Sequence, residues 1–595
     1  MSRTIFVLAL CTALHAQAVT RFVYYRSGNP MPPYTNLQTA AVTIQDAVDV
    51  CSDGDLVLVG GGTYDAGGAP APGFTLSNRV MIANRIRVES ITDAERTIII
   101  GAPDPGTGGK GTNAVRCAYL TNGAELVGFT LSNGYTRLGW FPINHDRYGG
   151  GAALDHGGIL QSCVVTHCYA FYKGGGVTLE SGGLVDQCTI RMCRAGSGGG
   201  VVCNAGGEVR NSTIEHNRAD TGPDISTAGG GGAYCISGLL YNCVLRHNVA
   251  QAGEESKGGG AILFESGDLI GCTIQSNYSE SWGGGVYAYR GGLMRNCAFV
   301  GNAADMNGGG VNLITTGTVQ GCLFALNESG SYGGGIACGF GGVVENATVV
   351  DNEALYGGGI QCNLGGAVWN SIVRDNTAWS NSPDFRISGS SPRIGYCCTP
   401  DVITGTYNTG GNITDNPIFV NAAALNYRLP ETSPCIDTGT NLPWTLAPGA
   451  VDLDGSNRIS AVVAEIVDVG CYEYQAEEPE PTRIPITSPN WKLKIKKKSV
   501  LRGKPVMPLL PEYLTNGYGI GMWDLDQDTN FDGPRQLDTK NGKVWKFKDK
   551  NDKTAKIIYK AKFSKKKNAF KTKLKYMYKG QMPVSNEPYA APLEM

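Results

Sequence analysis

Three of the six histidines in this 595-residue chain recur at one position of a repeated unit, beside an alternation of charges. His216 and His247 are expected to lie one repeat apart, with Glu215 next to His216. Arg191 and Arg246 fall at the Glu215 position in the neighbouring repeats. Imidazole and carboxylate groups in this arrangement could act as general acid and base or hold a metal ion. The alternative is a ladder of alternating ion pairs with histidines in the adjoining turns, which implies no chemistry.

A second candidate site lies in an acidic run near the C-terminus. Carboxylate and amide side chains alternate there, followed by a glycine, at Asp524, Asp526, Asp528, Asn530 and Asp532. Calcium takes about six to eight oxygen ligands, and the loops that bind it use such spacing. The glycine comes later than in an EF-hand and no glutamate follows at the expected distance, so an acidic turn is the competing interpretation. The shorter run Asp452–Gly455 has the same two interpretations.

The unit that positions the histidines is repeated nine times between Gly149 and Asn376. Each copy begins with a glycine triplet, and the triplets recur about every 25 residues, a period typical of a solenoid. The apolar residues of each copy form three short groups whose members lie two residues apart, which predicts three short strands and three turns. Stacked copies would pair in register about 4.8 Å apart and form a parallel β-helix.

Glycine and asparagine are predicted to occupy the corners of each coil, because both tolerate the left-handed backbone conformation. One asparagine recurs in each unit from Asn217 to Asn376, at positions 217, 248, 277, 302, 327, 352 and 376. Cys168 and Cys193 stand at this position in the first two coils.

Most of the 19 cysteines are interpreted as buried fillers of the core. Cys272, Cys297 and Cys322 share a repeat position that other copies fill with serine or alanine, so we expect them to be buried and reduced. Secreted chains rich in cysteine commonly form disulfides instead. The pairs for which a disulfide is considered are Cys168 with Cys193, Cys397 with Cys398, and Cys435 with Cys471.

The two ends of the chain differ from the repeats. Residues 1–18 have the pattern of a secretory signal, with a charged start, an apolar stretch and a small-x-small end, and no later run of 18 apolar residues predicts a transmembrane helix. Residues 483–595 carry 25 Lys and Arg against 10 Asp and Glu and alternate lysine with apolar residues, which predicts a small antiparallel β domain. The partner expected for this basic module in an exported protein is an anionic cell-envelope polymer rather than a specific nucleic acid.

Three stretches resemble known families. The helix pattern Ala40–Val50, followed by Gly54–Gly60 and Gly62–Tyr64, resembles the opening of pectin-lyase-like β-helices, in which a helix caps the first coil. Gly258–Ile262 and Phe324–Asn327 look like repeats of the polymorphic outer-membrane proteins, a family of bacterial surface β-helices. A third set resembles the choice-of-anchor Q module, which closes many bacterial secreted β-helix proteins: Asn416–Val420, Tyr427–Leu429, Ser433–Gly439, Asp452–Gly455 and Val467–Tyr474.

The predicted fold is all-β: a right-handed parallel β-helix with a short N-terminal helical cap and a small C-terminal antiparallel β domain. The predicted divisions are a signal peptide (1–18), the cap and first coils (19–148), the regular repeats (149–376), the anchor-like end of the β-helix (377–474), an acidic linker (475–482) and the lysine-rich domain (483–595).

The resemblances imply an exported cell-surface or extracellular protein, associated with the outer membrane, that is non-enzymatic and adhesin-like or glycan-binding and is attached or sorted through its C-terminal module. The alternative is a polysaccharide lyase or glycoside hydrolase that acts on an acidic polysaccharide in the groove of the β-helix. A lyase requires a base, often Lys or Arg, and a hydrolase requires a pair of carboxylates. The faces of the repeats show no cluster of three aspartates, and no pair of Arg or Lys residues stands out from the ladders. Calcium is the cofactor considered, and polysaccharide or an anionic envelope polymer is the expected partner.

Overall fold

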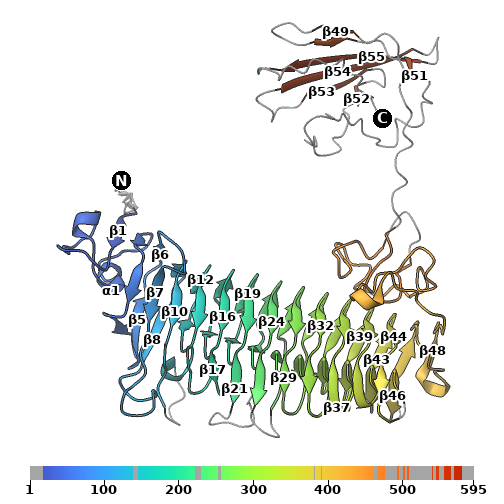
Figure 1. Cartoon of the computed structure of the whole chain (residues 1–595), viewed down its shortest axis with the longest axis horizontal. Coiled ribbons are helices and arrows are strands. Elements are labelled where there is room, and N and C mark those ends of the chain that lie inside the picture. Colours follow the sequence, from blue (N-terminus) through green and yellow to red (C-terminus); the bar gives the residue numbers. More distant parts are fainter. Residues whose placement is uncertain are drawn as a thin grey trace, which may run out of the picture. The chain divides into compact units, whose positions relative to one another are not determined.

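The structure is a computed structural model that describes residues 18–138, 145–220, 229–251, 256–380, 382–389, 391–459 and 466–475, together with the backbone of seven strands between 492 and 578. The chain divides into two compact units, residues 1–475 and residues 476–595 (Figure 1). Among the described residues, no helix combines the length and the apolar character that crossing a membrane would require.

The first unit is a parallel β-helix whose coils place one strand in each of three long sheets, named A, B and C, and one in a shorter sheet D. Sheet A comprises, in spatial order, β1 (Thr20–Val23), β2 (Leu56–Val59), β6 (Arg87–Ser90), β9 (Glu125–Val127), β12 (Ile159–Gln161), β15 (Leu184–Asp186), β19 (Glu208–Arg210), β23 (Leu239–Tyr241), β27 (Asp268–Ile270), β31 (Leu293–Arg295), β35 (Thr318–Gln320), β39 (Val343–Glu345), β43 (Ala367–Trp369), β47 (Arg393–Gly395) and β48 (Asn408–Gly410).

The predicted charge ladder lies on the outer face of sheet B, and the predicted histidine column lies at its edge. The sheet has twelve strands. They are β3 (Gly62–Tyr64), β7 (Thr97–Ile100), β10 (Thr130–Ser132), β13 (Val164–Thr166), β16 (Thr189–Arg191), β20 (Thr213–Glu215), β24 (Val244–Arg246), β28 (Thr273–Gln275), β32 (Ala298–Val300), β36 (Leu323–Ala325), β40 (Thr348–Val350) and β44 (Ile372–Arg374).

Sheet C follows the glycine triplets of the repeats. Its strands are β4 (Ala69–Pro70), β5 (Ser77–Ile82), β8 (Val115–Leu120), β11 (Ala152–Leu154), β14 (Val177–Leu179), β18 (Val201–Cys203), β22 (Ala233–Ile236), β26 (Ala261–Phe264), β30 (Val286–Tyr289), β34 (Val311–Leu313), β38 (Ile336–Cys338), β42 (Ile360–Asn363) and β46 (Phe385–Ser388). In sheets A, B and C the strands of the repeats pair in parallel and in register, as Ile190 of sheet B does with Ile214.

Sheet D corrects the prediction of three strands per coil. Its eight strands follow the recurring asparagine position: β17 (Arg194–Ala195), β21 (Arg218–Asp220), β25 (Val249–Gln251), β29 (Tyr278–Ser279), β33 (Ala303–Ala304), β37 (Glu328–Tyr332), β41 (Glu353–Tyr356) and β45 (Thr377–Ala378). Seven of the eight strands bury one alanine or serine, such as Ala250 or Ser329. One alanine or serine per coil gives no apolar periodicity, so the sequence pattern does not predict this sheet.

The recurring asparagines form a buried ladder but do not occupy the left-handed corners, so that part of the prediction is wrong. The left-handed residue is the one before each asparagine, such as His216 or His247, both with φ of 54°. Asn302 instead accepts hydrogen bonds at Oδ1 from both the backbone N–H and the Nδ2 group of Asn277 (3.1 and 2.9 Å), and its own Nδ2 donates to the carbonyl of Ile274 (2.8 Å). A carboxamide is selected here because it donates and accepts at once.

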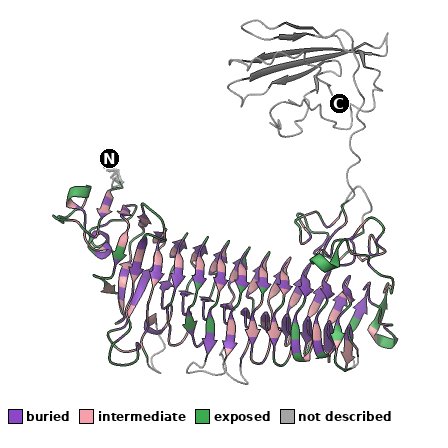
Figure 2. Cartoon of the chain, in the orientation of Figure 1, coloured by how far each residue is buried: buried purple, intermediate pink, exposed green. Residues whose placement is uncertain are grey.

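The core fills the space enclosed by the sheets (Figure 2). Strands of sheet A such as β12 and β27 alternate buried and less buried residues, whereas strands of sheet C such as β14 and β18 are buried at every residue. Equivalent residues stack from coil to coil, as the rings of Phe299 and Phe324 do at 4.5 Å between centroids. The glycine triplets are required by close backbone approach: a Cβ on Gly199 would lie 2.4 Å from the carbonyl oxygen of Arg218. Cys272, Cys297 and Cys322 are buried free thiols, and the described residues contain no disulfide.

Both ends of the β-helix are covered. Helix α1 (Ile44–Val48), shorter than the predicted 40–50, is capped by Thr43 and packs Ile44, Ala47 and Val48 onto the first coil. Short 3₁₀ helices occur at η1 (Leu37–Thr39), η2 (His145–Arg147), η4 (Gly405–Tyr407) and η5 (Ala422–Ala424). At the other end, Ile403 and Tyr407 close the last coil.

Residues 411–475 have no strand among their described residues and fold back onto the outer face of sheet B. Tyr427 and Tyr472 pack there against Leu323, Ala325 and Val350. We name this stretch the C-terminal pad. Its docking explains why the outward side chains of the late strands of sheet B are apolar, since they are removed from water.

The second unit contains antiparallel strands. One pair is β49 (Lys492–Lys494) with β50 (Val500–Arg502). A five-stranded sheet has the order β51 (Val506–Met507), β55 (Ala569–Tyr578), β54 (Ala555–Ser564), β53 (Val544–Lys548) and β52 (Thr539–Lys540).

Candidate functional site

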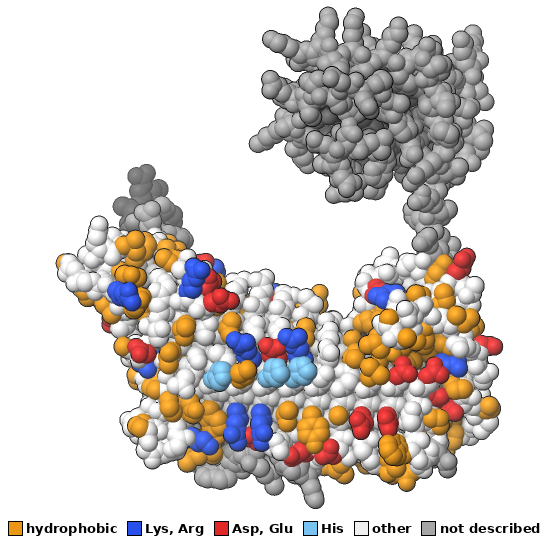
Figure 3. Space-filling view, in the orientation of Figure 1, with side chains coloured by type: hydrophobic (Ala, Val, Ile, Leu, Met, Phe, Trp, Pro, Cys, Tyr) orange, Lys and Arg blue, Asp and Glu red, His pale blue; other side chains and the backbone are white. Residues whose placement is uncertain are grey.

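The outer face of sheet B is divided into two parts with opposite chemistry (Figure 3). On the late strands β36, β40 and β44 the outward residues Leu323, Val350 and Ile372 are buried under the C-terminal pad. On the earlier strands β10, β13, β16, β20, β24 and β28 the outward residues are partly or fully exposed, apart from Thr166, which is buried, and they are mainly hydroxyl-bearing or charged. We name these six strands the open face. Their outward polar residues are Thr130, Ser132, Thr166, Thr189, Arg191, Thr213, Glu215, Arg246, Thr273 and Gln275.

The predicted charge ladder lies on the open face. Arg191, Glu215 and Arg246 are in register on β16, β20 and β24. Glu215 pairs with Arg246, whose Nη2 lies 2.7 Å from a Glu215 oxygen and whose Nε donates to the same oxygen at 2.8 Å. Arg191 is exposed and makes no ion pair with any described carboxylate. The ladder therefore has one neutralised pair and one guanidinium that is available to a ligand.

The histidine column lies directly beside this ladder, at the corner where the chain leaves sheet B. His167, Met192, His216 and His247 all adopt φ between 52° and 54° and are exposed. The rings of His216 and His247 are stacked, with 5.0 Å between centroids and 15° between planes. Stacked rings present parallel edges and do not converge on a common point. Among the described residues, no three His, Cys, Asp or Glu side chains are arranged to hold a metal ion.

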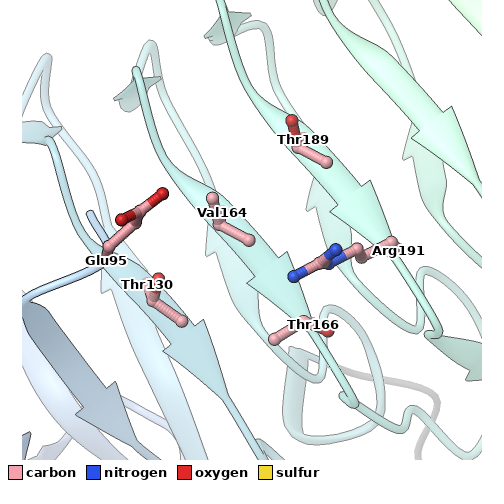
Figure 4. A pocket seen from close by; sticks show the side chains of 6 residues that line it. All are labelled: Glu95, Thr130, Val164, Thr166, Thr189 and Arg191. Atoms are coloured by element: carbon pink, nitrogen blue, oxygen red, sulfur yellow. The ribbon is translucent and has the colours of Figure 1, made fainter.

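A shallow hollow opens at the N-terminal end of the open face (Figure 4). It is lined by Glu95, Thr130, Val164, Thr166, Thr189 and Arg191. Figure 4 shows the Glu95 carboxylate and the Arg191 guanidinium on opposite sides, with threonine hydroxyls between them. Threonine stands before the inward residue in four of the six strands of the open face, β10, β16, β20 and β28, and this recurrence is a sequence signal that could have indicated the row. Glu95 lies outside the repeats, and no repeat pattern predicts it.

Sheet D adds two exposed arginines that the sequence analysis did not select. Arg194 and Arg218 are in register on β17 and β21, and their side chains are 57% and 47% exposed. Both contact the buried carboxylate of Asp220, and the Nε of Arg218 lies 3.2 Å from it. In the later strands of the same sheet Glu328 and Glu353 take the equivalent position. The positive charge of this surface is thus concentrated beside the open face.

Of the two acidic runs considered as calcium sites, the structure describes only the shorter one. Asp524, Asp526, Asp528, Asn530 and Asp532 lie outside the described residues. In the shorter run, the oxygens of Asp452 accept backbone N–H groups from Asp454, Ser456 and Glu473. Asp454 forms a bidentate pair with Arg428, at 2.5 and 2.6 Å. These two carboxylates already have structural partners, which favours the interpretation as a turn.

The sheets of the first unit define the class of the protein: it is a right-handed parallel β-helix. No family model matches the sequence, and no curated protein matches it. Among solved structures the chain is similar to the crystal structure of pectate lyase Pel9A, with 14% sequence identity, a TM-score of 0.36, and coverage of 77% of this chain and 98% of that chain. A likeness at this level concerns the fold and gives no information on ligand or activity.

Proposed function

We propose that this chain is an exported β-helix protein that binds a polysaccharide along the open face of sheet B without catalysing a reaction on it. The observation that carries the proposal is the contrast within this one sheet: its apolar part is covered by the protein's own C-terminal pad, whereas its polar part is left open. A polar face that the fold does not need for packing is available for binding.

The chemistry of the open face suits an extended, hydroxyl-rich polymer. Neighbouring strands lie about 4.8 Å apart, so the six strands span roughly 24 Å along the axis. Threonine hydroxyls both donate and accept hydrogen bonds, and Arg191 offers a planar set of donors. Arg194 and Arg218 next to this row would favour sugars that carry carboxylate or sulfate groups. His216 and His247 would contribute at the edge of the same surface.

The C-terminal unit is proposed to attach or sort the protein at the cell surface. Its basic sequence supports contact with an anionic envelope polymer.

The binding test compares the full chain with variants on a panel of neutral, carboxylated and sulfated polysaccharides. Arg191→Ala combined with Arg218→Ala is expected to weaken retention of the acidic polymers at least several-fold. Arg290→Ala is the matched control, because Arg290 is equally exposed but lies in a turn after sheet C. Equal binding by the double variant and the control would contradict the proposed site.

The same incubation tests the catalytic alternative. A lyase would release unsaturated products that absorb in the ultraviolet, and a hydrolase would release new reducing ends. Either product, formed by the parent chain and lost in the double variant, would overturn the non-catalytic part of the proposal.

A further inference from the structure

The outward row of sheet D carries opposite charges at its two ends. The first residues of its eight strands pair in register, and an isolated bridge places Tyr169 of the coil before in the same row. We name it the sheet D row. Strands β17, β21, β29 and β37 mark its course along one side of the β-helix (Figure 1). In order, the row reads Tyr169, Arg194, Arg218, Val249, Tyr278, Ala303, Glu328, Glu353 and Thr377.

The basic end of the row has an excess of positive charge. The side chains of Arg194 and Arg218 are about half exposed, and both contact Asp220, whose carboxylate is largely buried. Two guanidinium groups therefore share one carboxylate. A partner that supplies further carboxylates to this end would complete the charge balance.

The acidic end of the row has carboxylates without cations. Glu328 is exposed, and Glu353, which is partly exposed, accepts the indole N–H of Trp379. In the part of the chain that the structure describes, no Lys, Arg or His side chain forms an ion pair with either glutamate. Three uncharged residues separate this end from the arginines.

Exposed aromatic side chains flank both ends of the row. Trp379, two residues after Thr377, is 77% exposed. Phe171, two residues after Tyr169, is partly exposed at the opposite end. Apolar side chains that remain exposed beside charged ones commonly mark a protein–protein interface, and tryptophan is among the residues that contribute most to binding there.

The sheet D row is complementary to itself. Arg218 and Glu328 each lie two strands from Tyr278, on opposite sides, and Arg194 and Glu353 each lie three strands from it. Two copies of the sheet can face each other about a two-fold axis that runs along the strand of Tyr278, between the sheets. This rotation reverses the order of the coils, so each residue faces the one at the same distance beyond Tyr278. Arg218 then faces Glu328 of the partner subunit, and Arg194 faces Glu353 of the partner subunit.

The same axis matches the uncharged positions. Val249 faces Ala303 of the partner subunit, one strand from the axis. Phe171 and Trp379 both belong to coils four strands from Tyr278, so the same rotation places one ring opposite the other at each end of the interface. An axis midway between Tyr278 and either neighbouring strand would place only one of the two arginines opposite a glutamate. The charges therefore select a single pairing.

We propose that two copies of this chain pair face to face through sheet D. The row is roughly 38 Å long from Tyr169 to Thr377. A stable interface covers about 800 Å² per partner, so a strip of this length must be about 20 Å wide and include the residues that flank the strands. Arg191 and the threonine row of sheet B lie outside the pairing row. An acidic polymer and the second copy would compete for Arg194 and Arg218.

The test is sedimentation equilibrium of the full chain over a concentration series, at about 0.1 M and about 1 M salt. We expect a monomer–dimer equilibrium whose dissociation constant rises with salt. Glu328→Arg would place two positive charges face to face and should raise the dissociation constant at least about ten-fold. Arg218→Glu should have the same effect through two negative charges.

Exchanging the two charges distinguishes this pairing from any other. Arg218→Glu combined with Glu328→Arg recreates an opposite pair at both symmetric positions, and we expect it to restore the dimer. The matched control combines Arg218→Glu with Glu353→Arg. It has the same composition, but like charges face each other at each altered position, so it should stay monomeric. Glu328→Gln with Glu353→Gln only removes charge. This milder variant should weaken the dimer, and it replaces any reversed variant that misfolds.

A parent chain that stays monomeric, or a dimer that Glu328→Arg leaves unchanged, overturns the proposal. The same holds for a charge exchange that restores no dimer, or a control that pairs as tightly as the exchange. The two glutamates lie outside the proposed polysaccharide site and the assay contains no polymer, so its outcome is independent of polysaccharide binding.

Discussion

Asn376 donates both its backbone N–H and its Nδ2 group to the same oxygen of Asp384, at 3.1 and 2.9 Å. This is the last step of the asparagine ladder, which runs coil by coil from Asn217. Every internal member accepts from the coil before it and donates to the coil after it. An aspartate can end the series because its carboxylate accepts without needing to donate.

The ladder predicts a large loss of stability when an internal member is removed. Asn302→Ala would leave the N–H and Nδ2 of Asn277 without their acceptor, and the carbonyl of Ile274 without its side-chain donor, inside the core. The oxygen of Asn327 would lose the bond from Nδ2 but keep the one from the backbone N–H of residue 302. We expect the free energy of unfolding to fall by about 3 kcal/mol, measured by urea denaturation. Asn242→Gly is the control, because Asn242 is exposed with φ of 52° and glycine accepts that conformation. Similar losses in both variants would show that the buried bonds contribute little.

The solenoid, the register of its coils and the buried cysteine ladder could be predicted because each is repeated. A glycine triplet or a Cys-x-Ile pattern that recurs many times indicates structure even when a single copy does not. Sheet D was missed because Ala219 and its equivalents bury one small residue per coil. The corner was misplaced because the residue before each ladder asparagine takes it, and its type varies from coil to coil, as in His216, Gly301 and Leu326. The asparagine itself, such as Asn217, is buried.

The open face could be predicted in part. Arg191, Glu215 and Arg246 follow from the repeat register, since in-register strands place equivalent residues in one row. The length of the open face does not follow from the repeat register, because the C-terminal pad determines which strands of sheet B are covered. That pad has no period, and its contacts join residues more than 100 positions apart, such as Thr348 and Cys471. Long-range packing of irregular chain leaves no local signal in a sequence.

Asp384 predicts that stability decreases between about pH 4 and pH 6. Burial raises the pKa of Asp384 from 3.8 to about 6, although the bonds from Asn376 partly oppose it. Within this pH window the folded chain keeps a proton on Asp384 that the unfolded chain has already released. The free energy of unfolding therefore falls as the pH rises through the window, and it stays at the lower value above about pH 6. Asp384→Asn keeps an acceptor for Asn376 and removes the titration. At pH 7 it should stabilise the chain by on the order of 2–3 kcal/mol.

The measurement is urea unfolding of the parent and the variant at pH 4, 5, 6 and 7. Asp468, whose pKa burial also raises to about 6, leaves a residual slope in the same direction in both proteins. The informative quantity is therefore the difference between them. Exposed Asp65→Asn serves as the control. A difference that is constant across the four pH values would contradict the assignment to Asp384.

The cysteine ladder predicts that serine is the best-tolerated replacement. Cys297 Sγ accepts the backbone N–H of Cys272 at 3.4 Å and contacts the carbonyl of Arg295. Ser371 makes the equivalent bond to the N–H of Ala347 at 3.1 Å, so a hydroxyl fits this role. We expect Cys297→Ala to cost about 1 kcal/mol in unfolding free energy and Cys297→Ser less. A larger cost for serine than for alanine would show that apolar volume, not the bond, sets the preference.

The C-terminal unit predicts salt-dependent attachment. Residues 483–595 hold 25 basic and 10 acidic residues, whereas the remainder of the chain has more acidic than basic residues. Attraction between this unit and a polyanion is screened as the Debye length falls from about 10 Å at 0.1 M salt to about 3 Å at 1 M.

We expect the full chain to sediment with anionic envelope preparations at low salt and to be released at high salt. A chain ending at residue 482 should not sediment under either condition. Equal sedimentation of both chains, or binding by the full chain that does not change with salt, would rule out electrostatic attachment through this unit and favour a sorting signal recognised by a receptor.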